Sequence, residues 1–131
     1  MNRRRIGVVL VGHGSREPYH KGVISYLTKQ LKKEYEFVGC AFMQINKPSI
    51  PEALEAAAEA GVEELIVQPV FLTRGVHTEL DIPELLNLPR GSRLGTIELK
   101  GRKILIKYGK PIDKDDRLLE ILKDRIREAM G

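Results

Sequence analysis

The chain has 131 residues, of which 42% are hydrophobic and 31% are charged, which is close to the average for soluble domains. This balance excludes disordered, collagen-like and membrane-spanning proteins, and the length predicts one domain over residues 1–131. A formal net charge of +4 favours anionic partners, whereas an aromatic content of 5% argues against nucleic acid as a partner.

The first third of the chain alternates strand-like and helix-like patterns. Residues 6–11 form a continuous apolar run, which is typical of a strand buried on both faces. Residues 18–35 carry apolar side chains at helical spacing, and residues 37–43 read as a second strand. Ser49 and Glu52 then form a capping box, which predicts that a helix begins there.

The middle of the chain repeats this alternation. Gly61 is expected to end the second helix in a left-handed conformation, and residues 65–72 are the third predicted strand. Pro69 should lie near the end of that strand because proline has no N–H to donate to a neighbouring strand. Asp81 is expected to cap a short helix over residues 82–86.

The last third contains a predicted hairpin and a helix. Residues 90–95 are polar and contain glycine, which predicts a mobile loop. Residues 96–99 and 103–108 flank a Lys-Gly pair, so they are expected to form a hairpin whose second arm is the fourth main strand. Residues 113–130 then predict a helix with an apolar stripe formed by Leu118, Leu122, Ile126 and Ala129.

Together these elements predict an α/β fold of the three-layer, flavodoxin-like type. The expected sheet has four parallel strands in the order 2-1-3-4, with helices on both faces. In that order strands 1 and 3 are neighbours, and the loops that follow them leave toward opposite faces. Such sheets bind ligands in the crevice at these strand ends. Residues 12–16 and 73–78 are therefore the loops expected to form the site.

Each of these two loops contains a histidine, His13 in the first and His77 in the second. A lone histidine is usually structural, but two at one predicted crevice weaken that reading. Neutral imidazole binds cobalt, nickel, zinc or iron, and it also accepts protons near neutral pH. Two protein ligands leave coordination positions open, as a catalytic or transfer site requires. The third histidine, His20, is expected to be solvated in the first turn of a helix.

The residues around His13 have two readings each. Gly12 and Gly14 serve either a tight turn with unusual backbone angles or the close approach of a flat or anionic ligand. Ser15 either caps the next helix, which we favour, or binds a ligand. The loop has no Gly-Lys-Ser/Thr, and Glu17 stands where a dinucleotide fingerprint has its third glycine, so neither nucleotide motif is present.

Charged residues surround the same predicted crevice. Glu79 is expected to orient His77 or to take up a proton. The single cysteine, Cys40, is expected to be a core residue, and it excludes an internal disulfide. Because the basic residues 1–5 precede too few apolar residues for a secretory leader, we expect a cytoplasmic protein. A ligand rich in carboxylates or phosphate is expected from the basic cluster, which contains Arg16, Lys47, Arg74, Arg90, Arg93 and Arg102.

Four motifs in this order resemble the class II tetrapyrrole chelatases, and most of all the half-length sirohydrochlorin cobalt/nickel chelatases of archaeal type. They are VLVGHGSR at 9–16, PSIPEAL at 48–54, VQPVFL at 67–72 and GVHTELDIP at 75–83. The resemblance implies a homodimer whose intersubunit cleft holds the macrocycle, with His13 and His77 as catalytic residues that hold the incoming metal ion. One departure is Gln44, where many relatives carry glutamate, and we assign Gln44 no catalytic role.

The reaction implied by this resemblance is insertion of Co²⁺ or Ni²⁺ into sirohydrochlorin with release of two protons. It would serve the biosynthesis of cobalamin or of the methanogenic nickel tetrapyrrole, with the metal as substrate and no permanently bound cofactor. The eight carboxylates of sirohydrochlorin match the basic residues around the predicted crevice. The resemblance places the macrocycle against Gly12, Gly14, Ser15, Arg16, Lys47, Arg74, Gly75, Val76 and Thr78.

Two other functions fit parts of the pattern. A metal or tetrapyrrole carrier would need the same site, and only steady turnover distinguishes an enzyme from a carrier. A phosphohydrolase with His13 as nucleophile is less well supported, because Gly12 stands where the phosphatase motif has an arginine.

Overall fold

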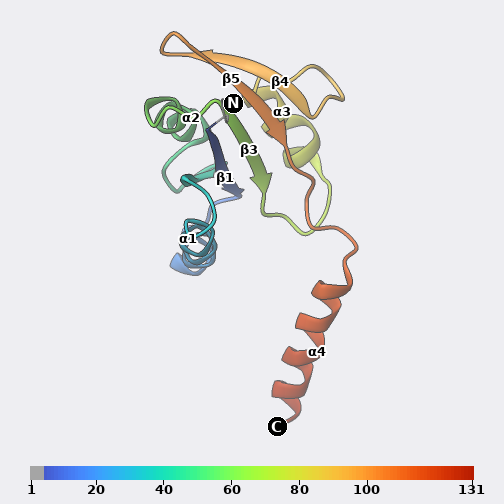
Figure 1. The fold of residues 1–131 in the computed structure, drawn as a ribbon. Coiled ribbons are helices and arrows are strands. Elements are labelled where there is room, and N and C mark those ends of the chain that lie inside the picture. The colour runs from blue at the N-terminus through green and yellow to red at the C-terminus, as the bar shows by residue number, and fades with distance from the viewer. Residues whose placement is uncertain (1–4) are drawn as a thin grey trace.

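The structure is a computed structural model that describes residues 5–131; the basic residues 1–4 lie outside the described part. Figure 1 shows a twisted sheet with helices against it and one helix that points away from it. The strands are β1 (Ile6–Gly12), β2 (Phe37–Phe42), β3 (Glu64–Pro69), β4 (Leu94–Leu99) and β5 (Arg102–Tyr108). The helices are α1 (Pro18–Leu31), α2 (Ile50–Glu59), the π-helix η1 (His77–Asp81), α3 (Ile82–Leu85) and α4 (Asp116–Met130).

The described sheet has five strands in the order β2-β1-β3-β5-β4. The order predicted for the four parallel strands is confirmed, and the predicted hairpin adds β4 as an antiparallel edge strand. Lys100 and Gly101 both have positive φ, 51° and 72°, the backbone twist that tight hairpins require. The prediction of a mobile loop over 90–95 is wrong at its end, because Leu94 and Gly95 already pair with β5.

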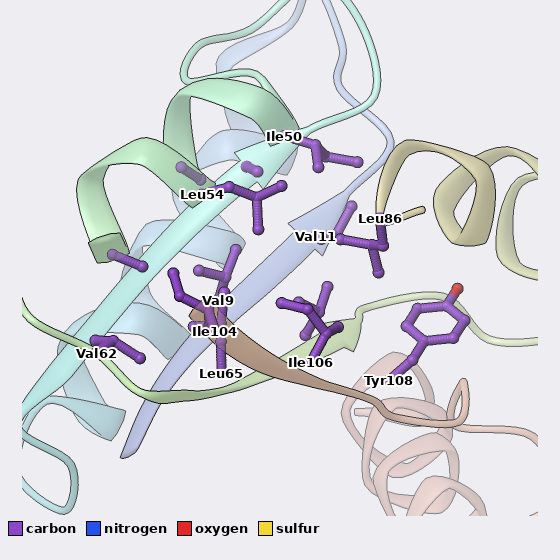
Figure 2. Packing of buried hydrophobic residues seen from close by; sticks show 14 of the residues in the cluster. Val9, Val11, Ile50, Leu54, Val62, Leu65, Leu86, Ile104, Ile106 and Tyr108 are labelled. Atoms are coloured by element: carbon purple, nitrogen blue, oxygen red, sulfur yellow. The ribbon is translucent and has the colours of Figure 1, made fainter. Parts of the chain in front are cut away.

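One face of the sheet holds the larger core. Residues of β1, β3 and β5 pack there against α2 and α3, and Figure 2 shows Leu65, Ile104 and Ile106 among them. The predicted capping box of α2 is present, since Ser49 accepts a hydrogen bond from the Glu52 amide and Glu52 accepts one in return. This face is a closed apolar layer that holds the strand ends in position.

The opposite face is covered in part by α1, which lies against β1 and β2. Its buried residue Ile24 contacts an apolar cluster from the two strands, and Cys40 packs at the margin of that cluster as predicted. The helix ends at Leu31 and the chain to Tyr35 continues as turns, so the predicted helix was four residues too long.

Helix α4 differs from the other helices because none of its residues is buried. Asp115 caps it, and hydrogen bonds from Arg117 lower the pKa of the Asp115 carboxyl to about 2. Figure 1 shows α4 extending from the body of the protein, beyond the end of β3. Helices were expected to cover both faces of the sheet. On the α1 face this covering is incomplete, because α4 does not pack there within its own chain. Among the described helices, none combines the length and apolar character needed to span a bilayer.

Candidate metal and tetrapyrrole site

The fold brings His13 and His77 together, as predicted. His13 follows β1 directly, and His77 opens η1 beyond the end of the neighbouring strand β3. Their ring centroids are 4.9 Å apart with an interplanar angle of 61°, and both side chains are half-buried. The ring of Phe71 lies within 6.4 Å of each, so the pair stands against an apolar wall.

His77 is held by a carboxylate. Its Nδ1 lies 2.8 Å from Oδ2 of Asp81, so Nδ1–H donates to the carboxylate and Nε2 keeps a free lone pair. This contradicts the expectation that Asp81 caps α3. Because η1 runs directly into α3, the backbone at Asp81 is already helical and offers no helix start to cap. Glu79, expected to orient His77, instead pairs with Arg93 at 3.6 Å.

His13 is held by the main chain. Its Nδ1 lies 3.1 Å from the carbonyl oxygen of Gly14, and its Nε2 lies 3.4 Å from Nε2 of Gln44. Gln44 is brought there by the loop after β2, whose amides donate to the carbonyls of Gly12 and His13. Sequence reasoning missed this contact because it joins loops 31 residues apart. Both imidazoles thus turn Nδ1 toward a carbonyl or carboxylate oxygen and leave Nε2 as the ligand atom.

The two glycines are required by the protein's own packing. Gly14 has φ +100°, and a Cβ there would lie 1.9 Å from the carbonyl oxygen of Gln44. A Cβ at Gly12 would lie 2.7 Å from Nε2 of His20. His20 is not solvated as predicted: it packs against Phe42, and its Nε2 is buried with no protein partner among the described residues. The tight-turn reading of the glycines is the one with structural support.

Ser15 does not cap α1, contrary to our expectation. The N-cap is Glu17, whose side chain makes no capping bond, and Oγ of Ser15 accepts from the Glu17 amide at 3.2 Å. The Ser15 amide in turn donates to Oδ1 of Asn46 at 2.7 Å. Ser15 therefore ties together the two loops that carry His13 and Gln44.

The turn that carries His77 is supported from below by Tyr108. The Tyr108 hydroxyl donates to the carbonyl of Thr78 at 2.6 Å, and burial raises its pKa to about 12. Thr78, expected to touch the substrate, is 1% exposed, and its hydroxyl bonds the backbone of Gly75. Val76, which directly precedes His77, is by contrast 65% exposed. Thr78 shapes the turn, while Val76 lies on the surface.

The predicted basic cluster is divided by the fold. Arg93 stacks over the Tyr108 ring at 5.1 Å and, with Arg74 and Ser92, lines a shallow pocket beside η1. Arg102 lies at the opposite end of the sheet, because β5 runs parallel to its neighbours and begins with Arg102. Its placement at the site was therefore wrong. Exposed side chains complete the set, namely Arg16, Lys47 and Arg90.

Between residues 5 and 131, the side chains form no cluster of three or more His, Cys, Asp or Glu suited to a metal ion. The protein therefore offers two imidazole nitrogens, with the Gln44 amide beside one of them. Such a pair binds a divalent ion through two ligands and leaves the remaining positions to water or to another molecule.

Comparison with known proteins identifies the family. The sequence model of the CbiX family matches residues 7–129. The chain belongs to the CbiX family. Its relatives include the sirohydrochlorin cobaltochelatase of Methanothermobacter thermautotrophicus, 41% identical over 96% of this chain and 94% of that protein. The sirohydrochlorin cobaltochelatase of Methanopyrus kandleri is 37% identical over 96% of this chain and 98% of its own length.

Solved structures show the same CbiX-type fold. A CbiX protein from Marinobacter aquaeolei VT8 superposes with a TM-score of 0.68 at 23% identity, over 95% of this chain and 97% of that one. The sirohydrochlorin chelatase SirB from Bacillus subtilis subspecies spizizenii, in complex with cobalt, gives 0.78 at 24% identity. This chain covers 50% of SirB, so one copy of the fold accounts for half of that protein.

Proposed function

We propose that this protein is a sirohydrochlorin chelatase that inserts Co²⁺ into the macrocycle and releases two protons. The observation that carries the proposal is the pair of imidazoles 4.9 Å apart, in which Nδ1 of each ring contacts an oxygen. Nε2 of His77 is left for a metal ion, and Nε2 of His13 contacts only the Gln44 amide, which an ion would displace. The names of the archaeal relatives supply the substrate and the metal. The ion is a substrate here, so a site with open coordination positions suits its transfer.

His13 and His77 hold the incoming ion through their Nε2 atoms. The hydrogen bond that Asp81 accepts from Nδ1–H of His77 fixes the ring and increases the basicity of its Nε2, as carboxylates do for metal-bound histidines. Two ligands hold the ion loosely enough for the pyrrole nitrogens to replace them. Gln44 is assigned no step, although its amide lies close enough to His13 to orient that ring.

The surface around the histidines suits a flat molecule with anionic edges. Exposed apolar side chains flank the pair, and positive side chains lie farther out. Arg74 and Arg93 line the pocket beside η1, where they would receive carboxylates of the macrocycle. The same role is proposed for Arg16 and Lys47 next to the His13 loop. The exposed apolar side chains are Ile45, Leu72, Val76 and Leu80.

The two pyrrole protons need acceptors, and the histidines are available once they give up the ion. In this step a pyrrole N–H breaks, the proton moves to Nε2 of the imidazole, and the nitrogen lone pair binds the metal. For His77, the Asp81 carboxylate stabilises the resulting imidazolium. The protons then pass to water as the metallated macrocycle leaves.

We also propose that the chain acts as one domain and pairs with a second copy in the cytoplasm, with the macrocycle between the two histidine pairs. Imidazole separates cobalt poorly from nickel, since nickel stands next to cobalt in the order of affinities. Nickel is therefore a second proposed metal, and its use would place the protein in the biosynthesis of the methanogenic nickel tetrapyrrole.

The test is an anaerobic absorbance assay with sirohydrochlorin and Co²⁺, Ni²⁺, Fe²⁺ or Zn²⁺, each compared with an enzyme-free blank. We expect acceleration with Co²⁺, and the Co²⁺ to Ni²⁺ rate ratio assigns the pathway. Tight macrocycle binding without turnover for any metal would support the carrier instead. Absence of macrocycle binding would overturn both the chelatase and the tetrapyrrole carrier.

A further inference from the structure

The face of the sheet that α1 occupies is only half covered. Strand register places Ile66 on β3 and Leu105 on β5 on this face, and both are partly exposed. Farther out, Leu94 on β4 is 53% exposed. In three-layer folds helices cover both faces of the sheet, so the part of this face beside α1 is left open.

The same register places the Lys107–Glu64 ion pair on this part of the sheet, whereas the neighbouring side of α1 is apolar. Tyr19, Val23 and Tyr26 are 78%, 55% and 62% exposed, although they lie on one flank of the helix. Buried Ile24 marks the side of α1 that faces the sheet, and the helical order of the residues fixes the flank on which the three lie. Because the crossover from β1 through α1 to β2 is right-handed, this flank is the one on the β3 side. We call the combined surface of Val23, Tyr26, Ile66 and Leu105 the open face.

Helix α4 has an apolar side and a length that match this open face. One side of it carries Leu118, Leu119, Leu122, Ile126 and Met130, and none of these is buried. Its 15 residues span about 22 Å. The seven residues of β5 span about 23 Å, so the helix has the length of the strands left bare.

The chain between β5 and α4 directs the helix away from its own open face. The amides of Ile112 and Asp113 donate to the carbonyls of Phe71 and Leu72, beyond the end of β3. Arg74 lies 3.9 Å from the Asp113 carboxylate and reinforces this attachment. The connection is thus fixed past the edge of the sheet where the histidines lie, and α4 starts three residues later (Figure 1).

We propose that α4 of one chain packs on the open face of a second copy, which returns its own α4 in the same way. This proposal rests on the dimer in the proposed function and specifies how it is built. Because α4 leaves from the edge that carries His13 and His77, the exchange makes the two histidine edges face each other. The exchanged helices then span the gap between the subunits and set the width of the cleft.

The experiment measures the mass of the full-length protein by light scattering. The wild type is expected at twice the chain mass of 14.8 kDa. Leu122→Lys on α4 and Val23→Lys on α1 should each give a monomer, because both side chains are exposed within one chain and needed only by the pair. Their controls, Asp124→Lys and Ser25→Lys, add a lysine to another side of the same helices and should stay dimeric.

Mixing the two monomeric variants is the decisive step. In an exchange, one of the two contacts is then intact, so dimer should partly return. If Leu122→Lys gives a monomer but Val23→Lys stays dimeric, α4 pairs with α4 of the second copy, and the proposal is overturned. If Leu122→Lys leaves the mass unchanged but lowers the Tm, α4 packs on its own chain, and the proposal is likewise overturned.

Two further substitutions guard against misfolding. Ile126→Lys and Tyr26→Lys alter more-than-half-exposed positions of the same two surfaces and should repeat the result. Because mass requires no substrate, failure of the chelatase is seen separately: a dimer without turnover would overturn the proposed function alone. A monomeric wild type with full turnover would overturn the exchange and the proposed dimer but not the chelatase activity.

Discussion

The two histidines lie side by side but are held by different means. His13 stands on a turn whose backbone is fixed by Gly14, and its neighbours are a carbonyl and a neutral amide. His77 stands on a helix, and its neighbour is the Asp81 carboxylate at 2.8 Å. A divalent cation therefore meets a negative charge on one side of the pair only. We expect His77 to bind the ion more firmly and His13 to release it first.

The largest effect is expected from removing either ligand. His77→Ala and His13→Ala should each reduce metal insertion by more than about 100-fold. Loss of a residue that only hydrogen-bonds to a metal ligand costs up to about 100-fold, and loss of the ligand itself should cost more. Macrocycle binding should be largely kept. If the two loops differ as described, a Co²⁺ titration followed by visible absorbance will show the greater loss of affinity for His77→Ala. An unchanged insertion rate in either variant would remove that histidine from the mechanism.

The carboxylate partner should matter next. Asp81→Asn keeps an oxygen that accepts from His77 but removes the charge, and Asp81→Ala removes both. We expect about 10- to 100-fold weaker Co²⁺ binding for the alanine variant and a smaller loss for the asparagine variant. Glu84→Gln changes an exposed carboxylate on the next turn and serves as the control. Equal KM values for Co²⁺ in all three variants would show that the two loops are equivalent.

Tyr108→Phe tests the support beneath the His77 loop. The carbonyl of Thr78 loses its donor, so the free energy of unfolding should fall by about 1–2 kcal/mol near neutral pH, as measured by urea unfolding. The wild type should lose further stability between pH 10 and 12. The unfolded chain ionises this tyrosine near 10.0, whereas the folded protein does so at about 12. The variant should lack this part of the alkaline loss.

The smallest effect is expected from making the loops alike. Gln44→Glu places a carboxylate beside His13, although at Nε2, whereas Asp81 contacts His77 at Nδ1. Co²⁺ affinity should rise a few-fold, which corresponds to about 1 kcal/mol for charges in a wet site. Gln30→Glu, far from the pair on α1, adds the same charge as a control. A lower affinity would show that the Gln44 amide itself assists the ion.

The parallel part of the fold could be predicted because its strands are continuous apolar runs separated by helical patterns. Such patterns report burial, and burial decides these elements. The pairing of His13 with His77 followed from the same strand order. The part played by Asp81 could not be predicted, because an aspartate before Ile-Pro looks like a helix cap when the preceding residues are taken for a loop.

The fate of α4 and of His20 shows the other limit. The apolar stripe of α4 predicted a helix, but a stripe does not say which surface covers it. His20 looked solvated from its place in the first helical turn, yet the missing side chain at Gly12 makes room for its ring. Both errors concern contacts between segments, which local patterns do not encode.

The wide turn of η1 has a consequence for chain length. The hydrogen bonds of a π-helix join residues i and i+5, so its turn holds about one residue more than an α-helical turn. Substitutions within η1 leave the number of residues between His77 and Asp81 unchanged. Removing one residue there would reduce the spacing of His77 and Asp81 from four residues to three, and so move the imidazole relative to the carboxylate that holds it. This segment therefore tolerates substitutions far better than insertions or deletions.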